Sequence, residues 1–420
     1  MTRALAAFSC VGMLLFLTGC GGASETSQDG AVQLTYWRTL TGPAGEAQDE
    51  LVKRFNEAHP DIHVTSLFQG GYSDLATKLL TAARANRGPD VTQLGTFEIR
   101  EFAKAGMLLD LTPILGELDT VDWPGTLIDA GRVDDGLYWL PFNVSVPVLY
   151  YDKTAFADAG LDGPPQTWDE FFAYARRLTS PGGEGKPPRT GMAFWRITWP
   201  FISMIWSEGG ELTDKNYTNI TLNDPMAVEV MTQVQALVRE GAATLPDIAS
   251  GGHRAAFLSG QAAMILDSPQ AYGEVMESGR DVGIAPYPAG KAGRVYAPGG
   301  GGLAVSATIP TEKRAAAQAF IEFMLSSESL AYFAQESGYL AFTPGSREIV
   351  QESATEAQMV MYDSLDYVRG DFSVNLAPPV RAAFDEAFQR IVTELAPVEA
   401  TLDAADAKAE KGLAEGAFSS

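Results

Sequence analysis

The first third of the chain alternates short apolar runs with longer amphipathic segments, and this alternation limits the possible folds more than any other feature. Apolar runs that predict strands occupy 32–37, 62–68 and 91–94. The two segments between them repeat apolar residues at helical spacing, centred on Leu51 and Leu79. A strand-helix-strand-helix-strand order is typical of a mostly parallel sheet covered by helices, so we expect an α/β protein.

Length and charge set the scale of the protein and exclude one class of partner. The chain has 420 residues, 46% of them hydrophobic, which is more than one hydrophobic core usually supports. We therefore expect two lobes. Lys and Arg number 30 against 53 Asp and Glu, a formal net charge of -23. Such a chain repels phosphate backbones, so nucleic-acid binding is not expected.

The N-terminus reads as an export signal. Arg3 precedes an apolar run, 4–17, that is too short to span a bilayer. The run ends in Leu-Thr-Gly-Cys, which resembles the lipobox of bacterial lipoproteins. That resemblance implies a signal peptide at 1–19, a lipid on Cys20 and a tether at 20–31.

Cysteine use and hydropathy agree with this interpretation. Removal of the signal peptide would also remove Cys10, so the mature chain would keep only the lipidated cysteine. Neither a disulfide nor a thiol catalyst is then available. Since no later segment is long and apolar enough for a transmembrane helix, the lipid would be the sole membrane anchor.

The rest of the chain contains further helix and strand signals. The sequence Thr-Trp-Asp-Glu at 167–170 is a capping box that predicts a helix to Leu178. Three tryptophans lie within 194–206, and Trp195 and Trp199 are spaced to share one face of a helix. Predicted strands follow near 263–265 and at 303–306, and an Ala-rich helix is predicted at 314–325.

Taken in order, several motifs resemble a known family. They are "GPDVTQL", "LPFNVSVPVLYYDKTAFADAGL", "FLSGQAAMIL" and "SGYLAFTPGS". From about residue 32 to about 395 the chain resembles the extracytoplasmic solute-binding proteins of bacterial ABC importers. Within the sugar-binding (family 1) branch it looks most like the binders of glycerol-3-phosphate and glycerophosphodiesters.

The resemblance implies a two-lobed periplasmic-binding-protein-like fold of type II. A ligand cleft would separate the lobes, and the chain would cross between them at several hinge segments. Lobe 1 would comprise 32–143 and 286–340, and lobe 2 would comprise 144–285 and 341–420. The first crossing would lie in the segment that contains Asn143.

Twelve residues are predicted to bind the ligand because of their chemistry, their places at strand ends or the resemblance. They are Trp37, Tyr72, Asn143, Ser145, Trp195, Trp199, Asp267, Ser268, Gly300, Gly301, Tyr339 and Arg369. Aromatic rings stack on sugars, and amide or carboxylate groups bond their hydroxyls. Ordinary packing, turns and helix caps remain alternative roles for these residues.

The four glycines at 299–302 do not predict a nucleotide site. No Lys-Ser/Thr follows them and no G-x-G-x-x-G pattern fits. We expect them either to bring backbone N–H groups close to a ligand or to form a tight bend before the strand at 303–306.

One part of the resemblance is incomplete. The glycerol-phosphate binders have an acidic residue where Thr96 stands, with Glu98 nearby, and an arginine where Ser373 stands. The nearest arginine is Arg369, and Arg38 is another candidate for a phosphate clamp. The absent arginine favours a neutral sugar over a phosphate ligand.

Catalysis and metal binding find little support in the sequence. The histidines, His59, His63 and His253, are too scattered for a metal site, and no hydrolase motif is present. We predict a non-enzymatic, cofactor-free, monomeric lipoprotein that binds a sugar or oligosaccharide, closes by hinge motion and serves an ABC permease. The alternatives are a glycerol-3-phosphate or glycerophosphodiester (glycerophosphocholine) binder and, because carboxylates are plentiful, a secreted glycoside-active enzyme.

Overall fold

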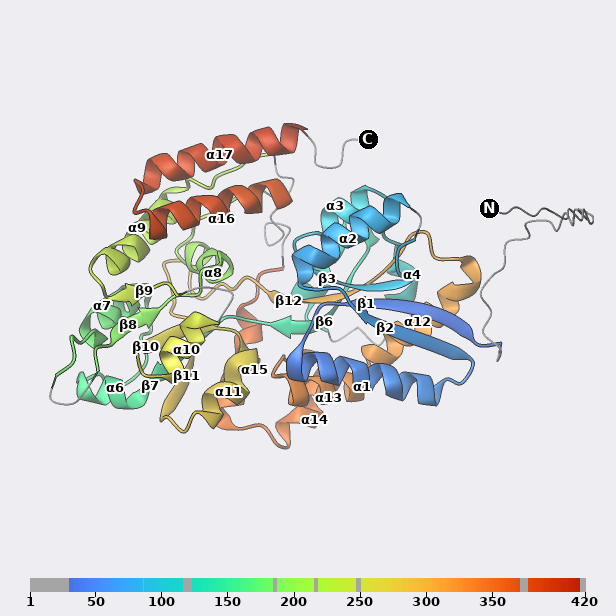
Figure 1. Ribbon diagram of the computed structural model, residues 1–420, viewed down its shortest axis with the longest axis horizontal. Helices are drawn as coiled ribbons and strands as arrows, with labels where there is room; N and C mark the ends of the chain where they lie inside the picture. The colour runs from blue at the N-terminus through green and yellow to red at the C-terminus, as the bar shows by residue number, and fades with distance from the viewer. Residues whose placement is uncertain are drawn as a thin grey trace, which may run out of the picture.

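The computed structural model describes residues 30–85, 87–115, 123–183, 187–214, 218–246, 251–370 and 377–415. Two five-stranded sheets lie side by side, each covered by helices, with the first sheet to the right and the second to the left in Figure 1. The predicted α/β architecture is therefore confirmed. The predicted signal peptide, Cys20 and nearly all of the tether lie outside the described residues.

The first sheet has the order β2-β1-β3-β12-β6. Its strands are β1 Val32–Arg38, β2 Ile62–Phe68, β3 Val91–Gly95, β6 Leu140–Ser145 and β12 Gly299–Val305. Strands β1, β2 and β3 run parallel, as the sequence predicted, while β12 is antiparallel to both β3 and β6. The glycines at 299–302 belong to β12, which corrects the predicted strand start at 303.

The second sheet has the order β11-β7-β10-β8-β9. Its strands are β7 Val148–Asp152, β8 Thr190–Ala193, β9 Ala243–Thr244, β10 Ala262–Asp267 and β11 Val282–Pro286. Strands β8, β9 and β10 are parallel, and β7 is antiparallel to β10 and β11. The carboxyl ends of β8 and β10 therefore meet at one edge of this sheet.

Helices cover both faces of the first sheet. The bounds are α1 Gly42–Ala58, α2 Tyr72–Arg84, α3 Ile99–Lys104, α12 Thr311–Met324 and α13 Ser327–Ser337, with α14 Pro344–Gln351 packed on α13. Helix α1 buries Leu51 and Phe55 as its apolar stripe predicts. Helix α2 begins at Tyr72, with Gly71 as its N-cap.

A second group of helices surrounds the other sheet. The bounds are α6 Lys153–Asp158, α7 Trp168–Leu178, α8 Trp199–Ser207, α9 Pro225–Arg239, α10 Gly252–Leu258, α11 Tyr272–Glu277, α15 Glu356–Asp363, α16 Pro378–Thr393 and α17 Val398–Glu415. Thr167 and Glu170 form the predicted capping box at α7. Helices α16 and α17 lie together across the top of this half in Figure 1.

The chain passes between the two sheets more than once. It leaves β6 at Ser145 and begins β7 at Val148, and it returns between β11 and β12. At the first passage the backbone N–H of Leu340 donates to the carbonyl of Val144 at 2.9 Å. Within the described residues, no helix is both long and apolar enough to cross a membrane.

Candidate functional site

The candidate site lies where strand ends of the two sheets face one another. Tyr72 follows β2 and Glu98 follows β3 in the first sheet, while Trp195 follows β8 and Ser268 follows β10 in the second. Loops after the carboxyl ends of parallel strands are the usual ligand-binding positions of open α/β sheets. Two such edges, one from each half, frame the cleft between the lobes.

A hydrogen-bonded chain of side chains lines the first-sheet side. Gln93 donates from Nε2 to the Asn143 amide oxygen at 2.7 Å, and Asn143 donates from Nδ2 to Tyr72 Oη at 2.8 Å. Thr39 holds the other end by donating from its backbone N–H and its hydroxyl to Gln93 Oε1. Asn143 is fully buried, so these bonds fix its orientation, and the Tyr72 hydroxyl also interacts with Thr39 and Tyr339.

The glycine segment of β12 lies between aromatic rings from the two halves. A methyl group at Gly301 would lie 2.8 Å from the Tyr72 ring, and one at Gly299 would lie 2.6 Å from the Trp199 ring. Gly300 has φ +95°, and a methyl there would lie 1.7 Å from the Asn143 carbonyl oxygen. Only glycine allows the strand to pass this close to both rings.

Tyr339 completes the first-sheet side beside Tyr72 and Asn143. Its ring stacks on Phe333 with centroids 5.7 Å apart. Burial raises the pKa of Tyr339 to about 12, with opposing effects from Asn143 and Tyr72. Burial likewise raises the pKa of Tyr72 well above its usual value. Both phenols therefore stay protonated at neutral pH and can donate hydrogen bonds.

Ser145 occupies the first passage between the sheets. Its side chain is buried, and its Oγ has no hydrogen-bond partner among the residues that the structure describes. An enclosed hydroxyl without a partner is unusual, because it loses its bonds to water without replacement. Its place at the end of β6 makes it a candidate contact for a bound solute.

The two tryptophans of the second half meet, although not as the sequence predicted. Trp195 precedes α8, which begins only at Trp199, so the two do not share a helix face. Their rings nevertheless form an edge-to-face pair with centroids 6.2 Å apart. Trp195 also stacks on His253 at 5.1 Å, and Trp199 Nε1 donates to the Ala297 carbonyl at 3.1 Å.

Asp267 supports this region from beneath and does not face the cleft. It is fully buried, and its carboxylate accepts from Arg254 and from the Ser268 N–H and lies 3.0 Å from His253 Nε2. Although burial opposes ionisation, His253 and Arg254 hold the pKa of Asp267 below its usual value. Its oxygens are occupied by these partners, which corrects the expectation that Asp267 binds sugar hydroxyls. Asp267 instead holds Ser268 and His253 in place.

Two other predicted residues lie in different surroundings. Trp37 is partly buried and packs against the apolar cluster beneath α2. Arg369 donates to Glu211 Oε1 at 2.8 Å and lies 4.9 Å from the Trp206 ring centroid. These contacts already engage the Arg369 guanidinium, which makes it a poor phosphate clamp.

The arginine that meets the first half across the cleft is Arg381 on α16, a residue that sequence reasoning did not single out. It lies 3.8 Å from Glu98 Oε1, and its guanidinium carbon is 4.2 Å from the Phe97 ring centroid. A cavity of about 320 Å³ lies here, between α2, the segment 97–102 and α16. Only the tertiary packing of α16 brings these groups together, and no local sequence signal could have identified them.

Burial makes two carboxyl groups near Arg381, those of Glu98 and Glu101, harder to ionise. Burial raises the pKa of Glu98 against the influence of Arg381. Burial also raises the pKa of Glu101 to about 7. Glu98 lies beside Gly95 and the Tyr72 ring, since a methyl group at Gly95 would be 3.3 Å from its Oε2. The cavity therefore continues the side of the site that Tyr72 lines.

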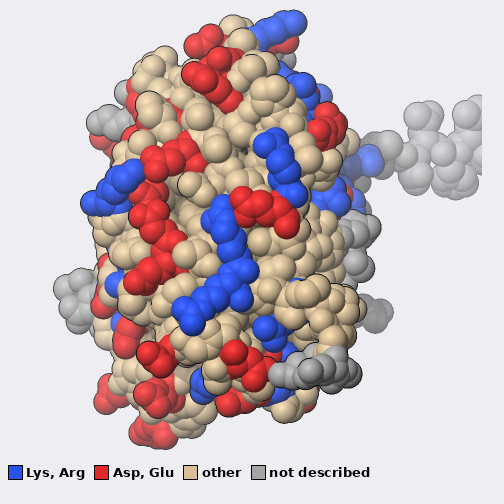
Figure 2. All heavy atoms as spheres, turned by 90° about the vertical axis from the view of Figure 1, so that its left-hand side faces the viewer, with Lys and Arg blue, Asp and Glu red and all other residues tan. Residues whose placement is uncertain are grey.

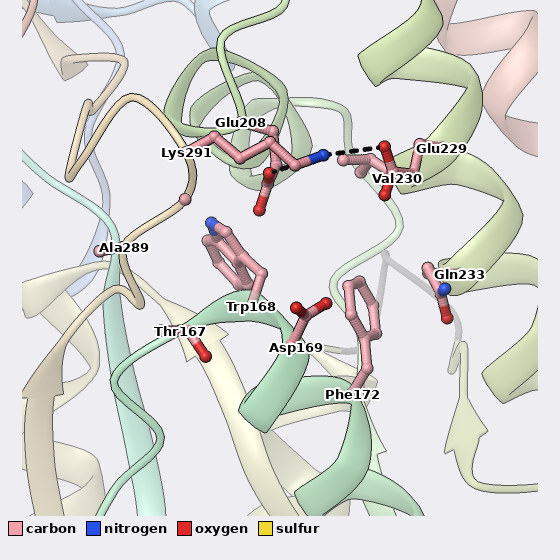
Figure 3. Close-up of a pocket in the computed structure, with 11 residues that line it drawn as sticks. Thr167, Trp168, Asp169, Phe172, Glu208, Glu229, Val230, Gln233, Ala289 and Lys291 are labelled. Carbon is pink, nitrogen blue, oxygen red and sulfur yellow. Dashed lines mark hydrogen bonds and ion pairs between the residues drawn. The ribbon is translucent and has the colours of Figure 1, made fainter.

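A separate pocket of about 250 Å³ lies on the second half, between α7 and α9 (Figure 3). Lys291 bonds Glu229 at 3.1 Å and lies 3.5 Å from Glu208 there. Its charge is already balanced, so we do not place the solute in this pocket. Across the described ranges, no group of three His, Cys, Asp or Glu side chains could hold a metal ion.

The sequence is similar to characterised transport proteins over most of its length. Residues 40–331 match the family of bacterial extracellular solute-binding proteins. The chain is 27% identical to the sn-glycerol-3-phosphate-binding periplasmic protein UgpB of Rhizobium meliloti, covering 91% of this chain and 94% of that protein. UgpB of Agrobacterium fabrum is 25% identical, with 89% of this chain and 90% of that protein covered.

Solved structures with the same fold bind small solutes. UgpB from Mycobacterium tuberculosis, crystallised with glycerophosphocholine, superposes with a TM-score of 0.81 at 26% identity, covering 92% of this chain and 99% of that one. The GacH receptor of Streptomyces glaucescens, studied with acarbose, gives a TM-score of 0.78 at 23% identity, covering 90% and 97% of the two chains. At that identity the second comparison establishes the fold alone.

Proposed function

The chain belongs to the bacterial extracellular solute-binding protein family, and on that premise we propose that it binds a sugar or oligosaccharide between its lobes. Members of the family are substrate-binding proteins of ABC importers and not enzymes. The protein is accordingly an extracytoplasmic binding protein that delivers a small solute to a membrane permease.

One observation carries the sugar proposal. The glycine segment of β12 lies against the Tyr72 ring at Gly301 and against the Trp199 ring at Gly299, and Trp199 pairs with Trp195, so one strand brings together rings from both halves. Rings that stack on sugar faces, beside donors such as Asn143, suit a solute with many hydroxyls. The proposed contacts are Tyr72, Asn143, Ser145, Trp195, Trp199, Ser268, Gly300, Gly301 and Tyr339.

Hinge closure follows from this division of contacts. Tyr72 and Asn143 belong to the first half, and Trp195 and Ser268 belong to the second. A solute that touches both sets favours the closed arrangement by its higher affinity for it. We propose lobe boundaries at 32–143 with 286–340, and at 144–285 with 341–420, although α14 packs on α13 of the first half.

Charge near the cleft favours a neutral solute over a phosphate. Arg381 is accompanied by Glu98 at 3.8 Å and Asp385 at 3.7 Å, and Glu101 lines the same cavity. The charge of Arg381 is therefore already shared with carboxyl groups, which leaves less of it for a doubly charged phosphate.

The second candidate is a glycerol-3-phosphate or glycerophosphodiester solute. Arg381 is a guanidinium that could engage a phosphate at the cleft, and the similar UgpB proteins are named for such ligands. A phosphodiester carries a single negative charge, so it suits the acidic surroundings better than a phosphomonoester.

Calorimetric titration with a panel of solutes separates the candidates. The panel contains maltose, maltotriose, glycerol-3-phosphate and glycerophosphocholine, with Trp195→Ala and Arg381→Gln as variants. The sugar proposal predicts saturable sugar binding that Trp195→Ala weakens and Arg381→Gln largely spares. Binding of phosphate compounds alone, lost in Arg381→Gln, would establish the second candidate. Hydrolysis of any glycoside would overturn both.

We also propose that Cys20 carries a lipid that anchors a monomer to the membrane after removal of 1–19. The Leu-Thr-Gly-Cys sequence at 17–20 supports this, together with the lack of a spanning helix among the described residues. Cell fractionation tests it: wild-type protein should sediment with membranes, and Cys20→Ser should appear in the soluble fraction. The same distribution of wild type and Cys20→Ser between the two fractions would contradict the proposed lipid anchor.

A further inference from the structure

A second pocket, of about 490 Å³, lies on the half built around the second sheet. Arg189 directly precedes β8, and Gly260 comes just before β10. The pocket therefore sits at the amino ends of these parallel strands, whereas Trp195 and Ser268 follow their carboxyl ends at the cleft. It is distinct from the solute site and lies at the opposite edge of the sheet.

Three arginines line this pocket, and we call it the arginine pocket: Arg177 at the end of α7, Arg189 and Arg280. Arg177 donates to the Gly160 carbonyl at 3.1 Å, and Arg189 donates to the Leu178 carbonyl at 3.1 Å. Within the described ranges neither guanidinium lies within ion-pair distance of a carboxylate. Both side chains are thus held by neutral acceptors and keep their full charge for a ligand.

Only some of the hydrogen-bond donors of the Arg280 guanidinium have partners among the described residues. It pairs with Asp152, while its buried Nε has no hydrogen-bond partner. It is held against Gly260, where a methyl group would come within 2.7 Å of its guanidinium. Two aspartates, Asp152 and Asp158, also line the pocket. Asp152 is occupied by Arg280 and by the cap of α6, so the pocket keeps an excess of positive charge.

Two other cations on this half are paired with carboxylates instead. In the pocket of Figure 3, Lys291 is flanked by Glu208 and Glu229. The neighbouring Arg176 on α7 pairs with Glu240 at 2.7 Å. In a chain of net charge -23, Arg177 and Arg189 thus bring two guanidinium groups without a carboxylate partner among the described residues into one pocket. Figure 2 shows Lys and Arg side chains gathered in a run across the middle of this end of the molecule.

We propose that the arginine pocket binds a phosphate-type oxyanion, either a free anion or the headgroup of an anionic lipid. Guanidinium groups bond such oxygens in pairs and more strongly than they bond neutral acceptors. Hydroxyls of Thr154 and Ser180 on the pocket wall add donors for the remaining oxygens. A site at this edge would allow anion binding and solute capture at the same time.

Titration of the full mature chain tests the site, with inorganic phosphate and, separately, with vesicles of phosphatidylglycerol or of phosphatidylcholine. The variant is Arg177→Gln/Arg189→Gln, and the matched control is Arg176→Gln, which removes a neighbouring arginine outside the pocket. We expect the double variant to lose about tenfold or more in phosphate affinity, while Arg176→Gln and cleft binding of the solute stay unchanged. Arg280 is left intact because its pair with Asp152 supports folding.

Each outcome decides the proposal. Phosphate binding without vesicle binding assigns the pocket to a free anion, and arginine-dependent binding to phosphatidylglycerol alone assigns it to lipid. If neither phosphate nor vesicles give saturable binding, the proposed site is overturned. An equal loss of phosphate affinity in Arg176→Gln would show that general surface charge attracts the anion, and it would also overturn the proposed site. Binding that survives in the double variant but disappears in Arg381→Gln places the anion in the cleft and also overturns it.

Discussion

The side-chain amide of Asn143 donates to the hydroxyl oxygen of Tyr72 at 2.8 Å, although the two residues are 71 positions apart in the chain. Gln93 occupies the amide oxygen of Asn143, so both orientation and polarity of the pair are fixed. The Tyr72 ring rests against Gly301, and its hydroxyl also interacts with Thr39 and Tyr339. We propose that this network organises the pair for a solute before one arrives.

Replacing Tyr72 with Phe should weaken solute binding about tenfold while changing stability little, because it removes one hydroxyl and keeps the ring on Gly301. Calorimetric titration and thermal melting measure both effects. Tyr332→Phe is the control, since that ring lies under Arg54, away from the site. Wild-type affinity in Tyr72→Phe would contradict the role given to the hydroxyl.

Replacing Ser145 with Ala should weaken solute binding without destabilising the ligand-free protein. The Ser145 hydroxyl is enclosed with no partner, so its removal should leave the unfolding free energy unchanged or raise it by about 1 kcal/mol. Ser203→Ala is the contrasting control, because the Ser203 hydroxyl accepts from the Ala297 N–H at 3.0 Å and its loss should destabilise. Urea unfolding measures the stability of the Ser145→Ala and Ser203→Ala variants, and titration measures their affinity for the solute. Loss of stability in Ser145→Ala with full affinity would assign Ser145 a purely structural role.

Much of the fold could be predicted because its signals are local. Strand β2 occupies Ile62–Phe68, the bounds that its apolar run predicted, and the capping box at Thr167 begins α7 as expected. Periodicity, caps and glycine turns act over a few residues and are visible in the sequence. The order of the motifs, carried by the family resemblance, supplied the two-lobed arrangement.

The misplaced elements depend on competing local signals. Spacing placed Trp195 and Trp199 on one helix, but Pro200 in the first turn begins α8 at Trp199. Glycine disfavours strands, so 299–302 was predicted to bring backbone N–H groups close to a ligand or to form a tight bend, yet pairing with β3 and β6 on both sides holds it in β12. A local helix-start signal overrode the spacing in the first case, and tertiary pairing outweighed propensity in the second.

The site residues that escaped prediction depend on long-range contacts. Arg381 meets Glu98 only because α16 packs beside the segment after β3. Asp267 looked available in the sequence, whereas His253 and Arg254 on α10 occupy its carboxylate. Pairings between residues far apart in the chain leave no pattern in a single sequence.

Replacing Arg381 with Gln should shift the ligand-free protein toward a more open arrangement. Arg381 joins α16 to Glu98 and Phe97 across the cleft, and Gln removes both the ion pair and the cation–π contact. Small-angle scattering should show a larger radius of gyration than for wild type. Arg390→Gln, on the solvent side of the same helix and paired only with Glu394 among the described residues, should leave it unchanged. An identical radius in Arg381→Gln would show that the contact does not hold the lobes together.

Glu101 should make the protein less stable as pH rises toward neutrality and beyond. Its buried Oε2 has no hydrogen-bond partner, and burial raises its pKa from 4.5 to about 7. Between these values the folded chain holds a proton that the unfolded chain releases. The unfolding free energy contributed by Glu101 is therefore full below about pH 4.5 and is lost as pH rises through about 7.

Urea unfolding of wild type and Glu101→Gln between about pH 5 and about pH 8 isolates this contribution. The amide cannot ionise, so the variant should be the more stable protein at the upper end, by about 2 kcal/mol. The exposed Glu57 supplies the control, because Glu57→Gln should keep the wild-type pH dependence. Parallel pH profiles for wild type and Glu101→Gln would mean that the Glu101 carboxyl ionises freely in the folded protein and that the cavity beside Arg381 is well hydrated.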